Sequence, residues 1–342
     1  MNDLIATRES FGNGLAEINN DKIVVLDADV DSSTKTSYFK EKYPERFIEN
    51  GIAEADMIGT AAGLATCGKI PVASTFAVFA TGRCYDQIRA SVAYPKLNVK
   101  IVGTHAGVTV GEDGATHQMV EDINLMRGLP NMVVLNPADD VSTRALVKEM
   151  IDYNGPVYMR LSRRKTERIY DDTQIKSYDE ADYLKNVGCE ANSNNLINLE
   201  CEANSKCLFK IGKGIQFGNG CDCTIFAIGD VLQEALKAKD ILAQKGINAR
   251  VCDMYSIKPI DKELIIKCAK ETNNLFTVED HSIIGGLGSA VSEVLCEEYP
   301  KKLVRIGIQD TFGKSGKCEE LLEYFGLTSE KIANVIEQKI EK

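Results

Sequence analysis

The sequence of 342 residues contains no tryptophan, only three histidines and no apolar run of about 20 residues that could cross a bilayer as a helix. Acidic residues outnumber basic residues by 50 to 40, which gives a net charge of −10. This excess of negative charge disfavours binding to nucleic acid or to an anionic membrane. We therefore expect neither as a partner, and any histidine chemistry must come from His105, His117 or His281.

The cysteines lack the spacing of a disulfide framework or a zinc site. There are eleven, an odd number, with no Cys-x-x-Cys pair and no close grouping with histidine. The amino-terminal residues include Asp3, Arg8 and Glu9 and no apolar signal core. These features predict reduced thiols, a cytoplasmic location and no metal site in this chain.

Short β-branched runs alternate with longer amphipathic stretches, a pattern typical of βα units on a largely parallel sheet. We expect strands at 23–26, 70–73, 99–102, 132–135, 157–160, 223–227, 249–253, 275–278 and 303–306. We expect helices at 4–18, 53–66, 84–93, 120–127, 142–151, 230–244, 262–269, 287–297 and 321–327. The predicted fold class is therefore α/β, with two domains whose sheets are largely parallel.

The predicted domain boundaries follow a change in composition. The stretch from Asp171 to Gly212 is polar and repeats Cys-Glu-Ala-Asn-Ser at 189–193 and 201–205. Such a stretch cannot bury enough apolar surface to order itself strongly. We therefore divide the chain into a first domain, a linker with an Asn-rich insertion and a second domain, at 1–170, 171–212 and 213–342.

The densest group of polar side chains lies at 104–118, between an expected strand and an expected helix. This glycine-rich stretch contains His105, Asp113 and His117. In an α/β protein, ligands bind at the carboxyl ends of the strands, and imidazoles can transfer protons near neutral pH. Two of the three histidines in one such loop favour a binding site over a solvated surface loop.

Other candidate residues have ordinary structural explanations on spacing alone. Glu54 falls in the first turn of an expected helix, where a carboxylate complements the helix dipole. Phe76 and Phe79 would share one face of a helix as a core pair. Arg8 and Arg163 are candidate anion ligands, although most arginines are solvated.

The sequence lacks two common phosphate-binding loops. Residues 285–290, Gly-Gly-Leu-Gly-Ser-Ala, lack the third glycine and the acidic partner of a dinucleotide fingerprint. We expect a tight loop before a helix there, with His281 in a structural role. There is also no Gly-x-x-x-x-Gly-Lys-Ser/Thr loop, so hydrolysis of ATP or GTP is not supported.

Several motifs, in this order, resemble the carboxyl-terminal half of the transketolase family. They are Ala-Thr-Arg8, Asp27-Ala-Asp29-Val-Asp-Ser-Ser33, Gly-Ile-Ala-Glu54, Ser-Thr-Phe76-x-x-Phe79, Thr-His105, Gly-Glu-Asp113-Gly-Ala-Thr-His117-Gln and Leu-Ser-Arg163. Residues 277–282 and 310–316 look like signatures of the family's C-terminal domain. The resemblance covers the pyrimidine-binding domain at 1–170 and the C-terminal domain at 213–342.

The resemblance implies thiamine diphosphate as the cofactor. Glu54 would then hydrogen-bond N1′ of the aminopyrimidine and favour the imino tautomer, whose nitrogen removes the C2 proton. Phe76 and Phe79 would line the pyrimidine pocket, and Asp29 would lie near the cofactor and the subunit interface. The implied reaction moves a two-carbon ketol unit from a ketose phosphate to an aldose phosphate, as in the pentose phosphate pathway.

The resemblance also implies roles toward the sugar phosphate. His117 would be the second catalytic residue, binding the C1 hydroxyl and carbonyl oxygen and assisting proton transfer, and Asp113 would recognise a substrate hydroxyl. The terminal phosphate would be held by Arg8, Ser33, His105 and Arg163.

The sequence departs from the family pattern in three places. Gly82 stands where many full-length members have a tyrosine against the pyrimidine, and Ala106-Gly107 replaces Asp-Ser. The diphosphate motif, Gly-Asp-Gly followed about 25 residues later by Asn, whose oxygens hold Mg²⁺, is missing. We therefore expect an N-terminal transketolase subunit as partner, holding Mg²⁺ or Ca²⁺, in an α₂β₂ assembly in which this chain also self-associates.

Three alternatives stay open at this point. Deoxyxylulose-phosphate synthase resembles the chain broadly but usually lacks the first loop histidine, His105. The beta subunits of 2-oxoacid dehydrogenases share the two-domain split form but lack Gly-Glu-Asp-Gly-x-Thr-His. A non-catalytic regulatory subunit is disfavoured because Glu54, both loop histidines and the anion-site arginines are present.

Overall fold

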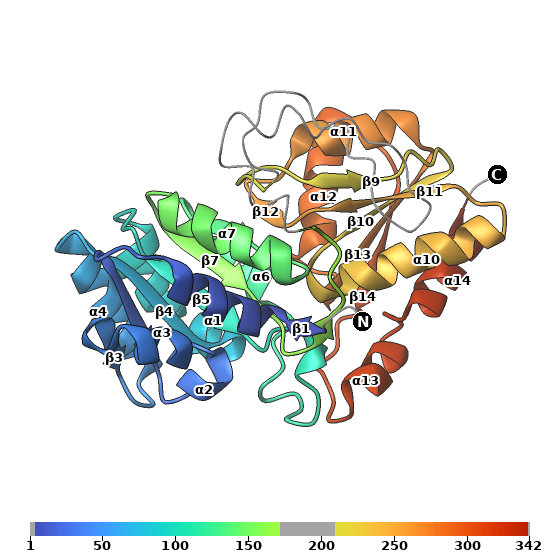
Figure 1. Ribbon diagram of the computed structural model, residues 1–342. Coiled ribbons are helices and arrows are strands. Elements are labelled where there is room, and N and C mark those ends of the chain that lie inside the picture. Colours follow the sequence, from blue (N-terminus) through green and yellow to red (C-terminus); the bar gives the residue numbers. More distant parts are fainter. Residues whose placement is uncertain (1–3, 172–208, 341–342) are drawn as a thin grey trace.

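The computed structural model describes residues 4–171 and 209–340, and two α/β units lie side by side in it (Figure 1). Most of the predicted insertion, at 172–208, lies outside the described residues. Strands that are buried on both faces carry runs of apolar residues, as in Ile23–Asp27, because helices cover both sides of the sheet.

The first sheet has seven strands in the order β12-β6-β7-β5-β4-β2-β3. Neighbouring strands are parallel except β12, which runs antiparallel to β6. The strands are β2 (Ile23–Asp27), β3 (Phe47–Glu49), β4 (Ile70–Phe76), β5 (Lys100–Thr104), β6 (Val133–Leu135), β7 (Val157–Arg160) and β12 (Ser256–Lys258). Since β12 comes from the second half of the chain, this sheet crosses the boundary that we predicted.

The second sheet has five strands in the order β14-β13-β10-β11-β9, parallel except for β9 against β11. They are β9 (Ile215–Phe217), β10 (Cys223–Ala227), β11 (Ala249–Asp253), β13 (Asn274–Ser282) and β14 (Leu303–Ile308). A small antiparallel pair, β1 (Ile5–Ala6) with β8 (Lys165–Thr166), joins the two ends of the first half. The prediction of an α/β fold with largely parallel sheets is confirmed.

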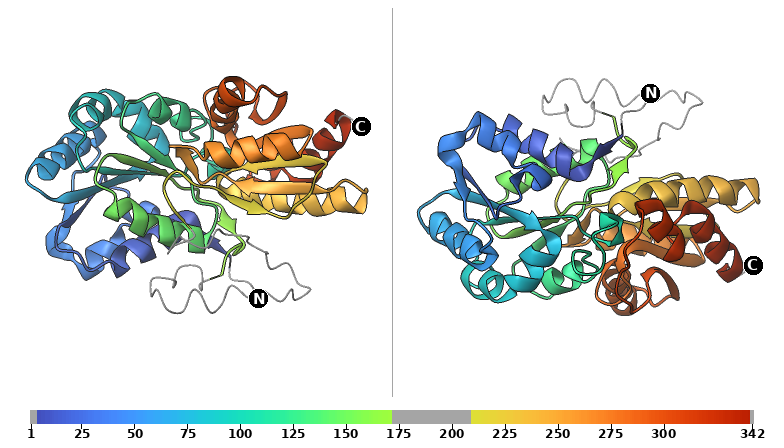
Figure 2. Two further views of the ribbon diagram at one scale, coloured as in Figure 1. Left: turned by 90° about the horizontal axis from the view of Figure 1, so that it is seen from above. Right: turned by 90° about the horizontal axis from the view of Figure 1, so that it is seen from below.

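Helices cover both faces of the sheets (Figure 2). One apolar cluster includes residues of α1, α7, α10 and α14, and the other includes residues of α4, α6, α11 and α12. The helices are α1 (Thr7–Glu17), α2 (Asp31–Thr34), α3 (Ser37–Lys42), α4 (Glu54–Thr66), α5 (Tyr85–Gln87), α6 (Asp122–Arg127), α7 (Asp140–Asp152), α10 (Leu232–Gln244), α11 (Lys262–Glu271), α12 (Leu287–Glu298), α13 (Cys318–Tyr324) and α14 (Ser329–Lys339). Within the described ranges, no helix is long and apolar enough to cross a membrane.

The main differences from the predicted helices lie at 79–93 and at the end of the described chain. The range predicted as one helix at 84–93 contains the short α5 and the π-helical turn η3 (Ile88–Ala93), and a further π-helical turn, η2 (Phe79–Arg83), precedes them. Helix α14 was not predicted, although Ile332, Ala333 and Ile336 are spaced to form a buried helical face. Irregular turns such as η2 occur frequently at functional sites.

Candidate functional site

The predicted site residues gather where the parallel strands of the first sheet end. Phe76 is the last residue of β4, His105 follows β5, and Arg163 follows β7. Ser33 lies in α2 after β2, and Glu54 opens α4 after β3. Because the carboxyl ends of parallel strands share one edge of a sheet, residues far apart in sequence come together here.

Glu54 is a buried carboxylate at a helix start. It is 6% exposed and begins α4, where the helix dipole favours negative charge. Its Oε1 accepts a hydrogen bond from Nη1 of Arg83 at 2.9 Å. The Arg83 guanidinium also lies over the Phe79 ring, 4.3 Å from the centroid. Arg83, which sequence reasoning did not single out, therefore bridges Glu54 and Phe79.

The two phenylalanines do not share a helical face, as their spacing suggested, because Phe76 ends a strand and Phe79 begins η2. Their rings are nevertheless nearly parallel, at 7°, with centroids 5.8 Å apart. His105 stacks on Phe76 at 3.9 Å, and His117 meets Phe79 edge-on at 5.6 Å. This continuous aromatic cluster joins the predicted cofactor residues to both loop histidines.

Arg8, Ser33 and His105 form a connected group. Nη1 of Arg8 donates to the Ser33 carbonyl at 2.8 Å and lies 3.0 Å from Nε2 of His105. Burial, reinforced by the charge of Arg8, lowers the pKa of His105 to about 3, so the ring is neutral. Its Nε2 then accepts from Arg8 while Nδ1–H donates to Thr104 at 2.9 Å. His105 therefore orients Arg8 and contributes no positive charge of its own.

Two arginines face the same space. The charge of Arg163 contributes to lowering the pKa of both Arg8 and His105, in each case less than burial does. Nη1 of Arg163 donates to the Val110 carbonyl at 3.0 Å and to Oδ2 of Asp113 at 3.4 Å. Nε of Arg8 is buried and has no hydrogen-bond partner among the described residues. That unused donor suits an anion.

Asp29 is exposed, with a left-handed φ of 62°. Its N–H donates to Oε1 of Glu49 at 2.8 Å, and the same oxygen accepts from the Gly51 N–H at 3.1 Å. Glu49 thus ties the turn at Asp29 to the turn that precedes Glu54.

Asp27 supports the loop that carries Ser33. Its Oδ1 accepts from the Val30 N–H at 2.8 Å, and Oδ2 accepts from the hydroxyls of Thr34 and Thr36. Burial raises the pKa of Asp27 to about 6. Asp27 was part of a family motif but was given no role, and Glu49 was not singled out from the sequence; the available signal for both was an acidic residue at the carboxyl end of a strand.

The second half of the chain holds the histidine loop. Gly107 has a φ of 78°, and a Cβ there would lie 1.9 Å from Oδ2 of Asp280. Asp280 in turn accepts from the backbone N–H groups of Val108, at 3.0 Å, and Thr109. Burial, with the charge of Asp230, raises the pKa of Asp280 to about 6. Gly107, one of the two residues at which this loop departs from the family pattern, therefore occupies a position without room for a side chain.

A buried ionic network lies behind this loop. Nε of Arg160 contacts both carboxylate oxygens of Asp122, the nearer at 2.9 Å, and Nη2 donates to the Asp280 carbonyl at 2.7 Å. His281 is fully buried here, and burial lowers its pKa to about 4. Glu279 accepts the N–H groups of Leu287 and Gly288 at the start of α12. The glycine loop at 285–290 thus binds the protein's own carboxylate.

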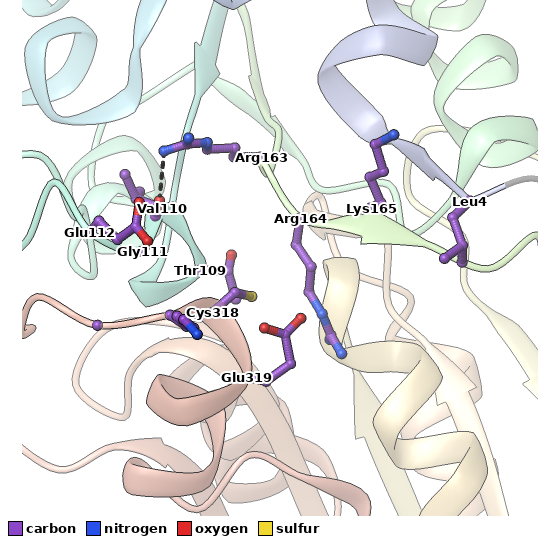
Figure 3. Close-up of a pocket in the computed structure, with 12 residues that line it drawn as sticks. Leu4, Thr109, Val110, Gly111, Glu112, Arg163, Arg164, Lys165, Cys318 and Glu319 are labelled. Carbon is purple, nitrogen blue, oxygen red and sulfur yellow. Dashed lines mark hydrogen bonds between the residues drawn. The ribbon is translucent and has the colours of Figure 1, made fainter.

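A cleft of about 450 Å³ lies between the two halves (Figure 3). Of the predicted site residues, Arg163 and no other lines it, within the described part of the chain. The lining residues are Leu4, Thr109, Val110, Gly111, Glu112, Arg163, Arg164, Lys165, Gly316, Lys317, Cys318 and Glu319. Residues 4–171 and 209–340 contain no group of three or more His, Cys, Asp or Glu that could hold a metal ion.

Two family models match the chain: the transketolase pyrimidine-binding domain at residues 3–168 and the transketolase C-terminal domain at 212–332. A protein of Methanocaldococcus jannaschii named as a transketolase C-terminal section is 48% identical over 98% of this chain and 96% of its own length. A 6-deoxy-6-sulfo-D-fructose transketolase subunit of a Clostridium species is 39% identical over 94% of this chain and 90% of its own length.

A longer relative and a solved structure are also similar to this chain. Rat transketolase is 34% identical over 100% of this chain, which spans 50% of that protein. The solved structure of a split gene transketolase, described as an inactive beta4 tetramer, superposes with a TM-score of 0.83 and 46% identity, covering 98% of each chain. With its two family domains and these relatives, the chain belongs to the transketolase family.

Proposed function

We propose that this chain is the C-terminal subunit of a split transketolase that transfers a two-carbon ketol unit from a ketose phosphate to an aldose phosphate. The observation that carries the proposal is the convergence of Glu54, the Phe76–Phe79 pair and both loop histidines at one sheet edge. Arg8 and Arg163 extend the same site with positive charge. Such a site suits a flat, nitrogen-rich cofactor ring at one end and a phosphate at the other.

The residues present fit the pyrimidine part of thiamine diphosphate. A planar N–H donor, the Arg83 guanidinium, already lies on the Phe79 ring and donates to the Glu54 carboxylate. An aminopyrimidine needs the same two contacts. When bound, thiamine diphosphate supplies the nucleophilic carbon that accepts and donates the two-carbon unit.

The remaining steps are assigned to side chains of this chain. Glu54 would pass a proton from its Oε1 to the pyrimidine nitrogen, which then donates back to the carboxylate, favouring one tautomer. His117 stands edge-on to Phe79 and would move a proton at a substrate oxygen. Arg8, kept in place by Ser33 and neutral His105, would bind the terminal phosphate together with Arg163. Asp113 pairs with Arg163 and would meet a sugar hydroxyl beside it.

The diphosphate and its metal ion are assigned to a partner chain. The chain matches half the length of rat transketolase, and a relative of known structure is described as a split gene product. Ile52, 76% exposed, lies two residues before Glu54 and would meet the partner rather than solvent. We propose an N-terminal subunit that holds Mg²⁺ or Ca²⁺ and completes an α₂β₂ assembly.

The test is reconstitution with such a partner, thiamine diphosphate and Mg²⁺. We expect ketol transfer from xylulose phosphate to ribose phosphate by the complex and none by this chain alone. Glu54→Gln should lower kcat by about 10²–10⁴ because it removes the protonatable group. Glu45→Gln, a matched change at a side chain that is 69% exposed, should leave the rate unchanged.

Other outcomes would redirect the proposal. Pyruvate decarboxylation without ketol transfer would favour a 2-oxoacid dehydrogenase subunit. Full activity of the chain alone would refute the split assembly, and normal activity of the Glu54→Gln complex would favour a non-catalytic subunit.

A further inference from the structure

The Arg83 side chain is held by two contacts within the described part of the chain. Its Nη1 donates to Oε1 of Glu54 at 2.9 Å, and its guanidinium carbon lies 4.3 Å from the centroid of the Phe79 ring. The Glu54 side chain is 7% exposed, whereas that of Arg83 is 54% exposed. The pair thus joins a fixed, buried carboxylate to a cation that reaches in from solvent.

A guanidinium is flat and presents N–H donors in its own plane, and it stacks on aromatic rings. An aminopyrimidine that is protonated at a ring nitrogen is also flat, donates N–H in plane and stacks. Two such groups cannot use the Oε1 atom of Glu54 and the same face of Phe79 at once. Arg83 therefore mimics the ligand that these two residues would bind.

We infer that Arg83 occupies the aminopyrimidine position in the cofactor-free chain and must leave Glu54 before the cofactor binds. This inference rests on the proposed function, since it takes Glu54 and Phe79 as pyrimidine ligands. Arg83 is then an internal competitor that weakens cofactor affinity and keeps the buried carboxylate paired when the site is empty. A buried carboxylate without a partner would otherwise be costly.

The surroundings allow Arg83 to move. The adjoining Gly82 is exposed, and a Cβ at that position would meet no described atom within 4 Å. Arg83 is the last residue of the irregular turn η2, and its side chain is about half exposed. Release requires the loss of one half-exposed ion pair and one ring contact.

The experiment is calorimetric titration of thiamine diphosphate, with Mg²⁺ present, into the complex of this chain with its N-terminal partner. We expect the Arg83→Ala complex to bind with a Kd about three- to tenfold lower than the unaltered complex, given the usual strengths of exposed ion pairs and cation–π contacts. High salt should narrow the difference between the two complexes because it screens the Arg83–Glu54 pair. Arg89→Ala, the same change at an exposed arginine six positions further on, should leave the Kd unchanged.

Each remaining outcome counts against the inference. An unchanged or higher Kd for Arg83→Ala would show that Arg83 does not compete with the cofactor. If Arg89→Ala lowered the Kd equally, the loss of one positive charge would explain the tighter binding, and the Arg83–Glu54 pair would not. Failure of every complex to bind the cofactor would instead overturn the proposed function, and the inference with it.

Discussion

Replacing Gly107 by alanine tests how the second half of the chain holds the histidine loop. Gly107 has a φ of 78° and a ψ of −170°, a backbone conformation that is essentially restricted to glycine and costs an L-residue about 1–3 kcal/mol. The new Cβ would also stand 1.9 Å from Oδ2 of Asp280, so this carboxylate must move. Asp280 would then weaken its hydrogen bonds to Val108 and Thr109, and charged hydrogen bonds contribute about 1.5–3 kcal/mol each. We expect a total loss of about 3–5 kcal/mol.

Gly246 provides a control for a positive φ without a steric clash. It has the same φ of 78°, but a Cβ there would meet no described atom within 4 Å. Gly246→Ala should therefore cost about 1–2 kcal/mol, the cost of a positive φ where a Cβ meets no neighbour. Urea unfolding followed by circular dichroism gives both values, since the chain has no tryptophan for fluorescence. Equal losses for the two variants would refute the role assigned to Asp280.

Two further predictions concern buried charge. Burial raises the pKa of Asp253 to about 8 from its ordinary 3.8, so wild-type stability should fall as the pH rises from about 4 to about 8, because unfolding then lets the carboxyl ionise. The melting temperature of Asp253→Asn, measured over this pH range, should fall less than that of the wild type. An equal fall in both proteins would contradict the prediction. Arg160→Met leaves Asp122 buried without its cation and should cost about 3–5 kcal/mol in urea unfolding. Adding Asp122→Asn should restore part of that loss; no recovery would mean that the pair is not the cause.

The regular elements were predictable because their apolar periodicity is strong. The strands at 157–160, 223–227 and 249–253 were placed with the bounds that the structure has. The extension of β13 to Ser282 was missed because its last residues are polar and charged, although the buried carboxylates of Glu279 and Asp280 accept backbone N–H groups. The helix expected at 84–93 is helical over 85–93, but its second part is π-helical, which apolar periodicity cannot reveal.

The candidate site could be predicted mainly from the family resemblance. Spacing alone assigned Glu54 to the helix dipole and Phe76 and Phe79 to a core pair, and neither reading anticipates that Arg83 bridges Glu54 and Phe79. The neutrality of His105 also depends on burial beside Arg8, which no local pattern contains. Roles for the site residues in catalysis stay predictions until the variants are measured.

Strand β12 has a consequence for how the chain can be divided. It leaves the second half to pair with β6 at the edge of the first sheet, through Ser256 and Lys258. A fragment that stopped at residue 171 would expose the backbone of β6, and open strand edges readily recruit other chains. The two family domains are therefore separable as sequences, but a strand from the second half of the chain completes the first sheet.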